Sequence, residues 1–123
     1  MVERLREIPR VRQPEGSVLR RRWFASPTVD LFVWEGESGV ERFELSYDNP
    51  RNEHAWHWTR EAGLSHWRID DGEGHPLANN TPIAVRDRED PRPDVAALAF
   101  EAIAGDIDVR TYRAIMKALW LER

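Results

Sequence analysis

Side chains follow a period of two in residues 29–34 and again in residues 40–47, and this periodicity is the clearest structural signal in the chain. In residues 29–34 every second position is aliphatic, and in residues 40–47 the alternate positions are Phe43, Leu45 and Tyr47. A period of two is typical of a strand that buries one face. Two glycines lie in the short segment between the two runs, so we predict a hairpin.

Other segments extend this sheet. Residues 18–24 fit a strand with an arginine-rich middle, and residues 54–59 and 65–71 fit two strands around a turn at 61–64. Residues 83–85 could add a short edge strand. The pattern therefore predicts an antiparallel meander of four to five strands.

The hairpin that begins at residue 54 has a preferred pairing. If the turn is centred at 61–64, Trp58 faces Trp67 and Trp56 faces Ile69, and every large apolar side chain lies on one face. A helix over residues 53–62 is the alternative, because an asparagine precedes this segment and a glycine follows it.

Two helices are predicted at the end of the chain. Residues 95–104 are rich in good helix formers, with Asp94 as the candidate cap and Gly105 as the stop. Asp108 is then predicted to cap a second helix that runs to about Leu121, because its apolar residues fall three and four positions apart.

Strands followed by two helices indicate an α+β fold in which the C-terminal helix pair packs on one face of the sheet. We expect one domain, with a basic N-terminal arm (1–16), the sheet (17–75), a linker (76–93) and the helix pair (94–123). A dimer in which two sheets or two helix pairs meet is the alternative cover for the apolar face.

The composition is that of a globular protein, with 41% hydrophobic and 33% charged residues. The chain has no cysteine, which excludes disulfides and thiolate metal sites. No apolar run approaches the roughly 18 residues that a membrane span needs. Residues 1–12 are charged throughout, unlike a signal peptide. We therefore expect a cytoplasmic protein with no membrane contact.

The net charge of −4 argues against a general nucleic-acid-binding function. The charge is unevenly spread, because residues 1–22 carry seven arginines against three glutamates. Residues 20–24, Arg-Arg-Arg-Trp-Phe, combine cations with aromatic rings as proteins that bind single strands do. The acidity of the whole chain nevertheless opposes that function.

The segment 54–75 holds three of the six tryptophans and all four histidines, His54, His57, His66 and His75. Imidazole and carboxylate groups suit zinc and related ions, but strand periodicity places His54 and His57 on opposite faces. In the preferred pairing Arg68 lies directly opposite His57, and a cation there disfavours a metal. We therefore expect neither a metal nor another cofactor.

The same pairing gathers four polar residues on the face away from the tryptophans, namely His57, His66, Arg68 and Asp70. At the edge of the other face His54 lies opposite Asp71, and a carboxylate that orients a histidine can make a general base. No nucleophile or oxyanion motif accompanies this pair. A metal-dependent or acid/base enzyme that uses the His/Asp cluster of this hairpin is therefore the alternative function.

Six tryptophans in 123 residues is a high content. Most are predicted to lie in the core, because each buries a large area. Trp34 shares a strand face with Phe32, on the side opposite Leu31, so both faces of this strand are apolar. That favours a central strand or cover by a second protomer. An exposed Trp34 or Trp120 would mark a partner or dimer surface.

A set of residues between 29 and 75 resembles a pattern in small bacterial proteins of uncharacterised families: Tyr47-Asp48, His54 to Trp58, His66 and Ile69 to Glu73. The resemblance implies no activity, cofactor or catalytic residue. We expect a bacterial cytoplasmic protein that acts without catalysis, by binding a protein partner, a second copy of itself or a small ligand.

Overall fold

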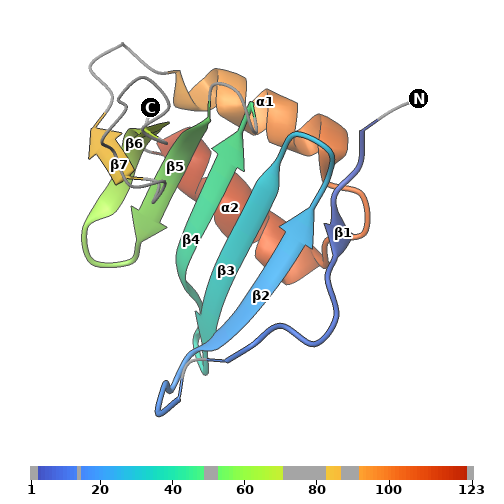
Figure 1. The fold of residues 1–123 in the computed structure, drawn as a ribbon, viewed down its shortest axis with the longest axis vertical. Coiled ribbons are helices and arrows are strands. Elements are labelled where there is room, and N and C mark those ends of the chain that lie inside the picture. Colours follow the sequence, from blue (N-terminus) through green and yellow to red (C-terminus); the bar gives the residue numbers. More distant parts are fainter. Residues whose placement is uncertain (1–2, 14, 49–52, 71–82, 87–91, 122–123) are drawn as a thin grey trace, which may run out of the picture.

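The computed structural model describes residues 3–13, 15–48, 53–70, 83–86 and 92–121. These residues form one antiparallel sheet of seven strands that follow one another in chain order, with two helices across one face (Figure 1). The strands are β1 (Arg6–Glu7), β2 (Arg20–Ala25), β3 (Asp30–Gly36), β4 (Gly39–Tyr47), β5 (His54–Thr59), β6 (Gly63–Asp70) and β7 (Ile83–Arg86). The helices are α1 (Pro93–Ile103) and α2 (Val109–Leu121). In the described part of the chain no helix is long and apolar enough to cross a membrane.

The predicted α+β class is confirmed, but the count of four to five strands is too low. One additional strand, β7, is the edge segment that the alternation at residues 83–85 suggested. The other, β1, lies within the predicted N-terminal arm and is too short to produce a periodic signal.

The N-terminal segment also takes part in the core. Leu5 is fully buried, and its backbone N–H donates to the carbonyl of Ile103 at 2.8 Å. Gly105, at the end of α1, has a φ of +57° and packs directly against Arg4 and Leu5. The start of the chain therefore closes over the turn between the two helices.

The core lies between the helices and one face of the sheet. A cross-strand row on this face contains Phe24, Leu31, Leu45 and Trp56, each at most a few per cent exposed. Complete burial of such a side chain stabilises the folded state by roughly 1.5–3 kcal/mol. The alternation that predicted strands in residues 29–47 therefore also identified the face that the helices cover.

The pairing of β5 with β6 differs from the predicted one by three residues. Trp56 lies opposite His66, not opposite Ile69, and Trp58 lies opposite Leu64. The cause is the turn, where Gly63 takes a φ of +80° and pairs with Thr59, so that the hairpin closes earlier than expected. An odd shift moves the side chains of β6 to the opposite face.

Of the two predicted N-terminal helix caps, the structure confirms one. Asp108 caps α2 as predicted, because its carboxylate accepts the N–H of Thr111 at 3.2 Å and the Thr111 hydroxyl at 3.0 Å. The predicted cap of α1, Asp94, is wrong. The cap position is Arg92, Pro93 takes the first helical position, and Asp94 pairs with Arg92 at 2.9 Å.

We expect Gly105→Ala to destabilise the protein more than Gly16→Ala. Both glycines have positive φ, which costs a non-glycine residue roughly 1 kcal/mol. A Cβ at Gly105 would also overlap Arg4 and come within 2.8 Å of the Leu5 carbonyl, whereas nothing lies within 4 Å of one at Gly16. Urea unfolding should show that the free energy of unfolding falls by about 2–3 kcal/mol in Gly105→Ala and by about 1 kcal/mol in Gly16→Ala. Equal losses would contradict the close packing at Gly105.

Candidate functional site

The predicted polar cluster does not form, because the pairing of β5 with β6 is shifted. His57 lies opposite Ser65 on the face away from the helices, whereas His66 and Arg68 lie on the helix face. The side chain of Asp70 is outside the described part of the structure. Asp71, the predicted partner of His54, is also outside the described residues.

The structure instead brings two histidines together on the helix face. His54 and His66 stack with ring centroids 5.4 Å apart, and Tyr47 places its hydroxyl 2.7 Å from Nε2 of His66. Trp56 packs against His66 at 4.5 Å. Both histidines are less than a tenth exposed, so this group is an aromatic stack at the edge of the core. The described residues contain no group of three potential metal ligands.

His57 occupies a different environment on the open face. Its Nε2 lies 3.9 Å from Oε1 of Glu44, beyond hydrogen-bond distance. Burial lowers the pKa of His57, because it disfavours the charged imidazolium, while Glu44 opposes the shift and Arg42 adds to it. The neutral form therefore predominates at pH 7.

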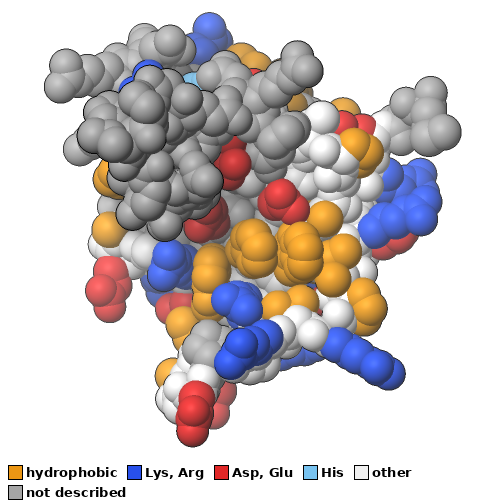
Figure 2. All heavy atoms as spheres, viewed as in Figure 1, with side chains coloured by type: hydrophobic (Ala, Val, Ile, Leu, Met, Phe, Trp, Pro, Cys, Tyr) orange, Lys and Arg blue, Asp and Glu red, His pale blue; other side chains and the backbone are white. Residues whose placement is uncertain are grey.

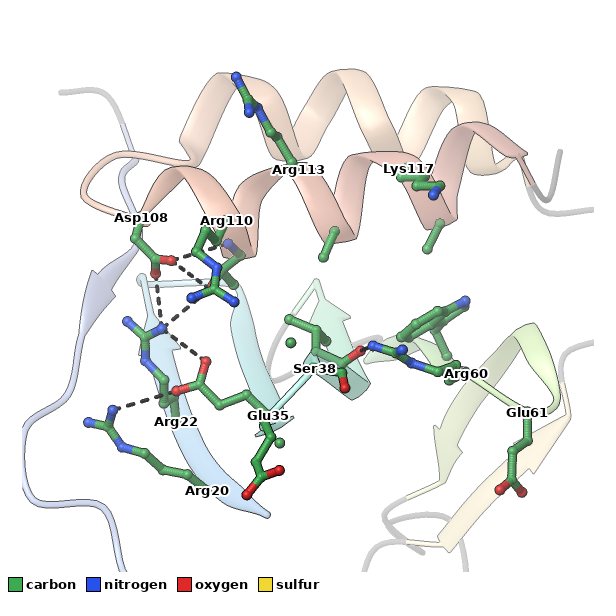
Figure 3. A pocket seen from close by; sticks show the side chains of 18 of the residues that line it. Arg20, Arg22, Glu35, Ser38, Arg60, Glu61, Asp108, Arg110, Arg113 and Lys117 are labelled. Carbon is green, nitrogen blue, oxygen red and sulfur yellow. Dashed lines mark hydrogen bonds and ion pairs between the residues drawn. The ribbon is translucent and has the colours of Figure 1, made fainter.

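A large cleft lies on the other side of the sheet, between α2 and the ends of strands β2 to β6 (Figure 3). Its volume is about 1300 Å³. Apolar lining comes from Val40, Trp58 and the small residues Ala114 and Ala118 of α2. The ring of Trp58 stacks on the buried ring of Phe43 with centroids 5.5 Å apart, so contact with the core fixes its position.

Arg22 anchors one end of the cleft. Its guanidinium forms two 2.8 Å bonds to Glu7, and it donates to Asp108 at 3.0 Å and to Thr111 at 3.3 Å. Glu35 lies 3.5 Å away on the adjacent strand. The hydrogen bonds to Glu7 raise the pKa of Arg22, and only 13% of its side chain is exposed. Its donors are thus already engaged, and it joins β1, β2 and the start of α2.

The remaining cations of the cleft fall into two groups. Arg20 pairs with Glu35 at 3.5 Å, and Arg60 pairs with Glu41 at 3.2 Å. Helix α2 carries Arg110, Arg113 and Lys117 and no acidic residue, and the ion pairs among the described residues use none of these three. Arg110 extends toward the strands, whereas Arg113 turns away from them (Figure 3).

The cleft was not among the sites predicted from the sequence. One signal was present, because the basic residues of α2 lie on the side opposite its apolar stripe. The facing wall comes from turns far away in the chain, including the segments 35–40 and 58–63. Their position depends on where α2 crosses the sheet, which no local pattern determines.

We expect the NMR titration midpoint of His57 to lie below its ordinary value of 6.5. Glu44→Gln should lower the midpoint further, because this carboxylate is the group that favours the charged imidazole. A midpoint at or above 6.5, or a rise in the Glu44→Gln variant, would contradict the partly buried position of His57.

We also expect Arg22→Met to reduce stability at pH 7 by about 2 kcal/mol. This is less than the roughly 3–5 kcal/mol of a fully buried pair, since solvent screens Glu7 and Asp108, which are 39% and 43% exposed. Hydrogen bonding to Arg22 lowers the pKa of Glu7. Burial alone would raise the pKa of Asp108, but hydrogen bonds from Thr111 and Arg22 outweigh it.

The pH dependence of this difference follows from those shifts. The stabilisation is complete above the ordinary pKa values of 4.5 for Glu7 and 3.8 for Asp108, and it is lost as the pH falls through the lowered values. Unfolding curves of the wild type and Arg22→Met should therefore converge in acid. A difference that stays constant from pH 7 to pH 3 would show that the ion pairs contribute little.

Comparisons with protein-family models, with curated proteins and with solved structures gave no match for this chain. The resemblance to small bacterial proteins stays a prediction.

Proposed function

We propose that the protein is a non-catalytic binding module, and that the cleft beside α2 binds an organic anion of the nucleotide class. Such a ligand has a flat ring and a chain of negative charges. The observation that carries this proposal is the pairing, in one cleft, of the half-buried ring of Trp58 with the guanidinium of Arg110, which has no carboxylate partner among the described residues.

The charge of the cleft supports an anion. Among the described residues, six cationic side chains line it; Arg20, Arg22 and Arg60 are paired with carboxylates, and the three cations of α2 are not, although the whole chain has a net charge of −4. The deepest cation, Arg22, is already saturated by Glu7 and Asp108. The cations left to meet a ligand are therefore those of α2, and a concave wall strengthens their field.

The dimensions also support a nucleotide. Arg110 and Lys117 are seven residues apart on α2, which separates them by roughly 10 Å along the helix axis. Trp58 lies in the same cleft beside the small residues of α2, which leave room for a ring above the indole. A ring stacked on Trp58 with phosphates near the cations would use both parts of the lining.

The acid/base enzyme remains the second candidate, on one observation. The Tyr47 hydroxyl lies 2.7 Å from Nε2 of His66, a geometry that permits proton transfer. We place it second because His66 and His54 are each less than a tenth exposed and a substrate would have to reach them.

Binding of metal-free ATP, measured by isothermal titration calorimetry at low salt, tests the proposal. Arg110→Gln should weaken binding about tenfold, as expected for the loss of one charged hydrogen bond. Arg6→Gln removes the same charge from an exposed side chain of β1 that does not line the cleft, so the affinity of this variant should stay within about twofold of the wild type.

Inorganic tripolyphosphate separates charge from ring recognition. It should bind more weakly than ATP, because it cannot stack on Trp58, and Trp58→Leu should remove that difference. The proposal fails if ATP does not bind at millimolar concentration, or if Arg6→Gln weakens ATP binding as much as Arg110→Gln.

A further inference from the structure

The face of the sheet away from the helices carries a patch of hydrophobic side chains (Figure 2), which includes three aromatic rings in contact with one another. The rings of Trp23 and Phe32 stack with centroids 5.5 Å apart and planes 11° from parallel. The ring centroids of Phe32 and Trp34 lie 6.3 Å apart. Arg42 places its guanidinium over the Trp34 ring at 4.5 Å. These rings are only partly buried, and both described helices pack on the opposite face. An aromatic surface of this kind is typical of an interface.

The strand register arranges the open face in rows that cross the strands. One row contains Arg21, Trp34 and Arg42 on β2, β3 and β4. The next row, two residues along each strand, contains Trp23, Phe32 and Glu44. Each strand thus contributes a pair: a cation and a ring on β2, two rings on β3, and a cation and a carboxylate on β4.

We propose that this face is the interface of a symmetric homodimer, in which two sheets pack face to face. A two-fold axis in the interface plane, running across the strands between the two rows, exchanges each residue with the one two positions along. Arg42 then meets Glu44 of the partner subunit. Trp34 meets Phe32 of the partner subunit, and Arg21 meets Trp23 of the partner subunit.

Every one of these contacts is favourable, and each occurs twice. The charged pair on β4 becomes two intermolecular ion pairs, the rings on β3 form a four-membered aromatic core, and the β2 contacts are cation–π pairs. Sheets packed in this way lie about 10 Å apart, with strands within about 30° of each other, which keeps the paired rows in contact.

This self-complementarity is the reason to choose a second copy over other occupants. A single-stranded nucleic acid would stack on the same rings but would bring phosphates to Glu44 and Asp30, which lie on this face. The interface is also independent of the cleft, because the cleft lies on the helix side of the sheet. The failure of one proposal therefore leaves the other intact.

Sedimentation velocity of the full chain from about 1 µM to 500 µM tests the dimer. The wild type should shift from monomer to dimer in this range, because the aromatic patch is small and the association should be of moderate affinity. Arg42→Glu and Glu44→Arg each place like charges opposite one another twice, so each should raise the dissociation constant at least tenfold.

The variant in which both charges are exchanged provides the decisive test. The double variant R42E/E44R restores opposite charges across the proposed axis and should recover dimerisation to within about threefold of the wild type. Arg113→Glu, which changes a charge on the helix side, is the matched control and should leave the dissociation constant unchanged.

Three results would overturn the proposal: a wild-type monomer at 500 µM, a dimer that neither single variant weakens, or a double variant as weak as the singles. Circular dichroism checks that each variant is folded. If a variant is not, concentration-dependent amide shifts of the wild type decide, because they should map to the open face of β2–β4. Shifts confined to α1 and α2 would contradict the proposed interface.

Discussion

Each strand of this meander presents alternate side chains to the two helices, so the pairing between neighbouring strands decides what every residue contacts. The hairpin of β5 and β6 makes this dependence visible. Because Gly63 closes the turn early, His66 points into the core beside Trp56, and Trp67 joins the opposite face next to His57. Which residues are buried and which are available for function follows from this one turn.

The two faces of the sheet carry different chemistry. On the helix side, Arg22 is surrounded by Glu7, Glu35 and Asp108, so its charge is compensated within the fold and it ties the N-terminal strand to the start of α2. The cations of α2 are not used in this way, and they border a cleft. On the open side, rings and opposite charges alternate along the strands. The proposed ligand and the proposed partner subunit thus occupy opposite faces of one sheet.

Patterns within one element were readable from the sequence, and contacts between elements were not. The alternation in residues 29–47 located β3, β4 and their buried face, and Asp108 marked the start of α2. The pairing of β5 with β6 was predicted wrongly, because it was chosen to place Trp67 and Ile69 on the face of Trp56 and Trp58, whereas the observed pairing follows from the positive φ of Gly63. The cleft could not be predicted from the sequence, because its walls come from segments that meet only when α2 crosses the sheet.

The separation of two binding surfaces by one sheet is the central claim, and ¹⁹F NMR of protein labelled with 5-fluorotryptophan tests it directly. The signals of Trp23 and Trp34, on the open face, should shift with protein concentration and not with ATP. The signal of Trp58, in the cleft, should shift with ATP and not with concentration, and the buried Trp56 should respond to neither. If ATP and concentration shift the same tryptophans, or if Trp56 responds to both, the two-surface account is wrong.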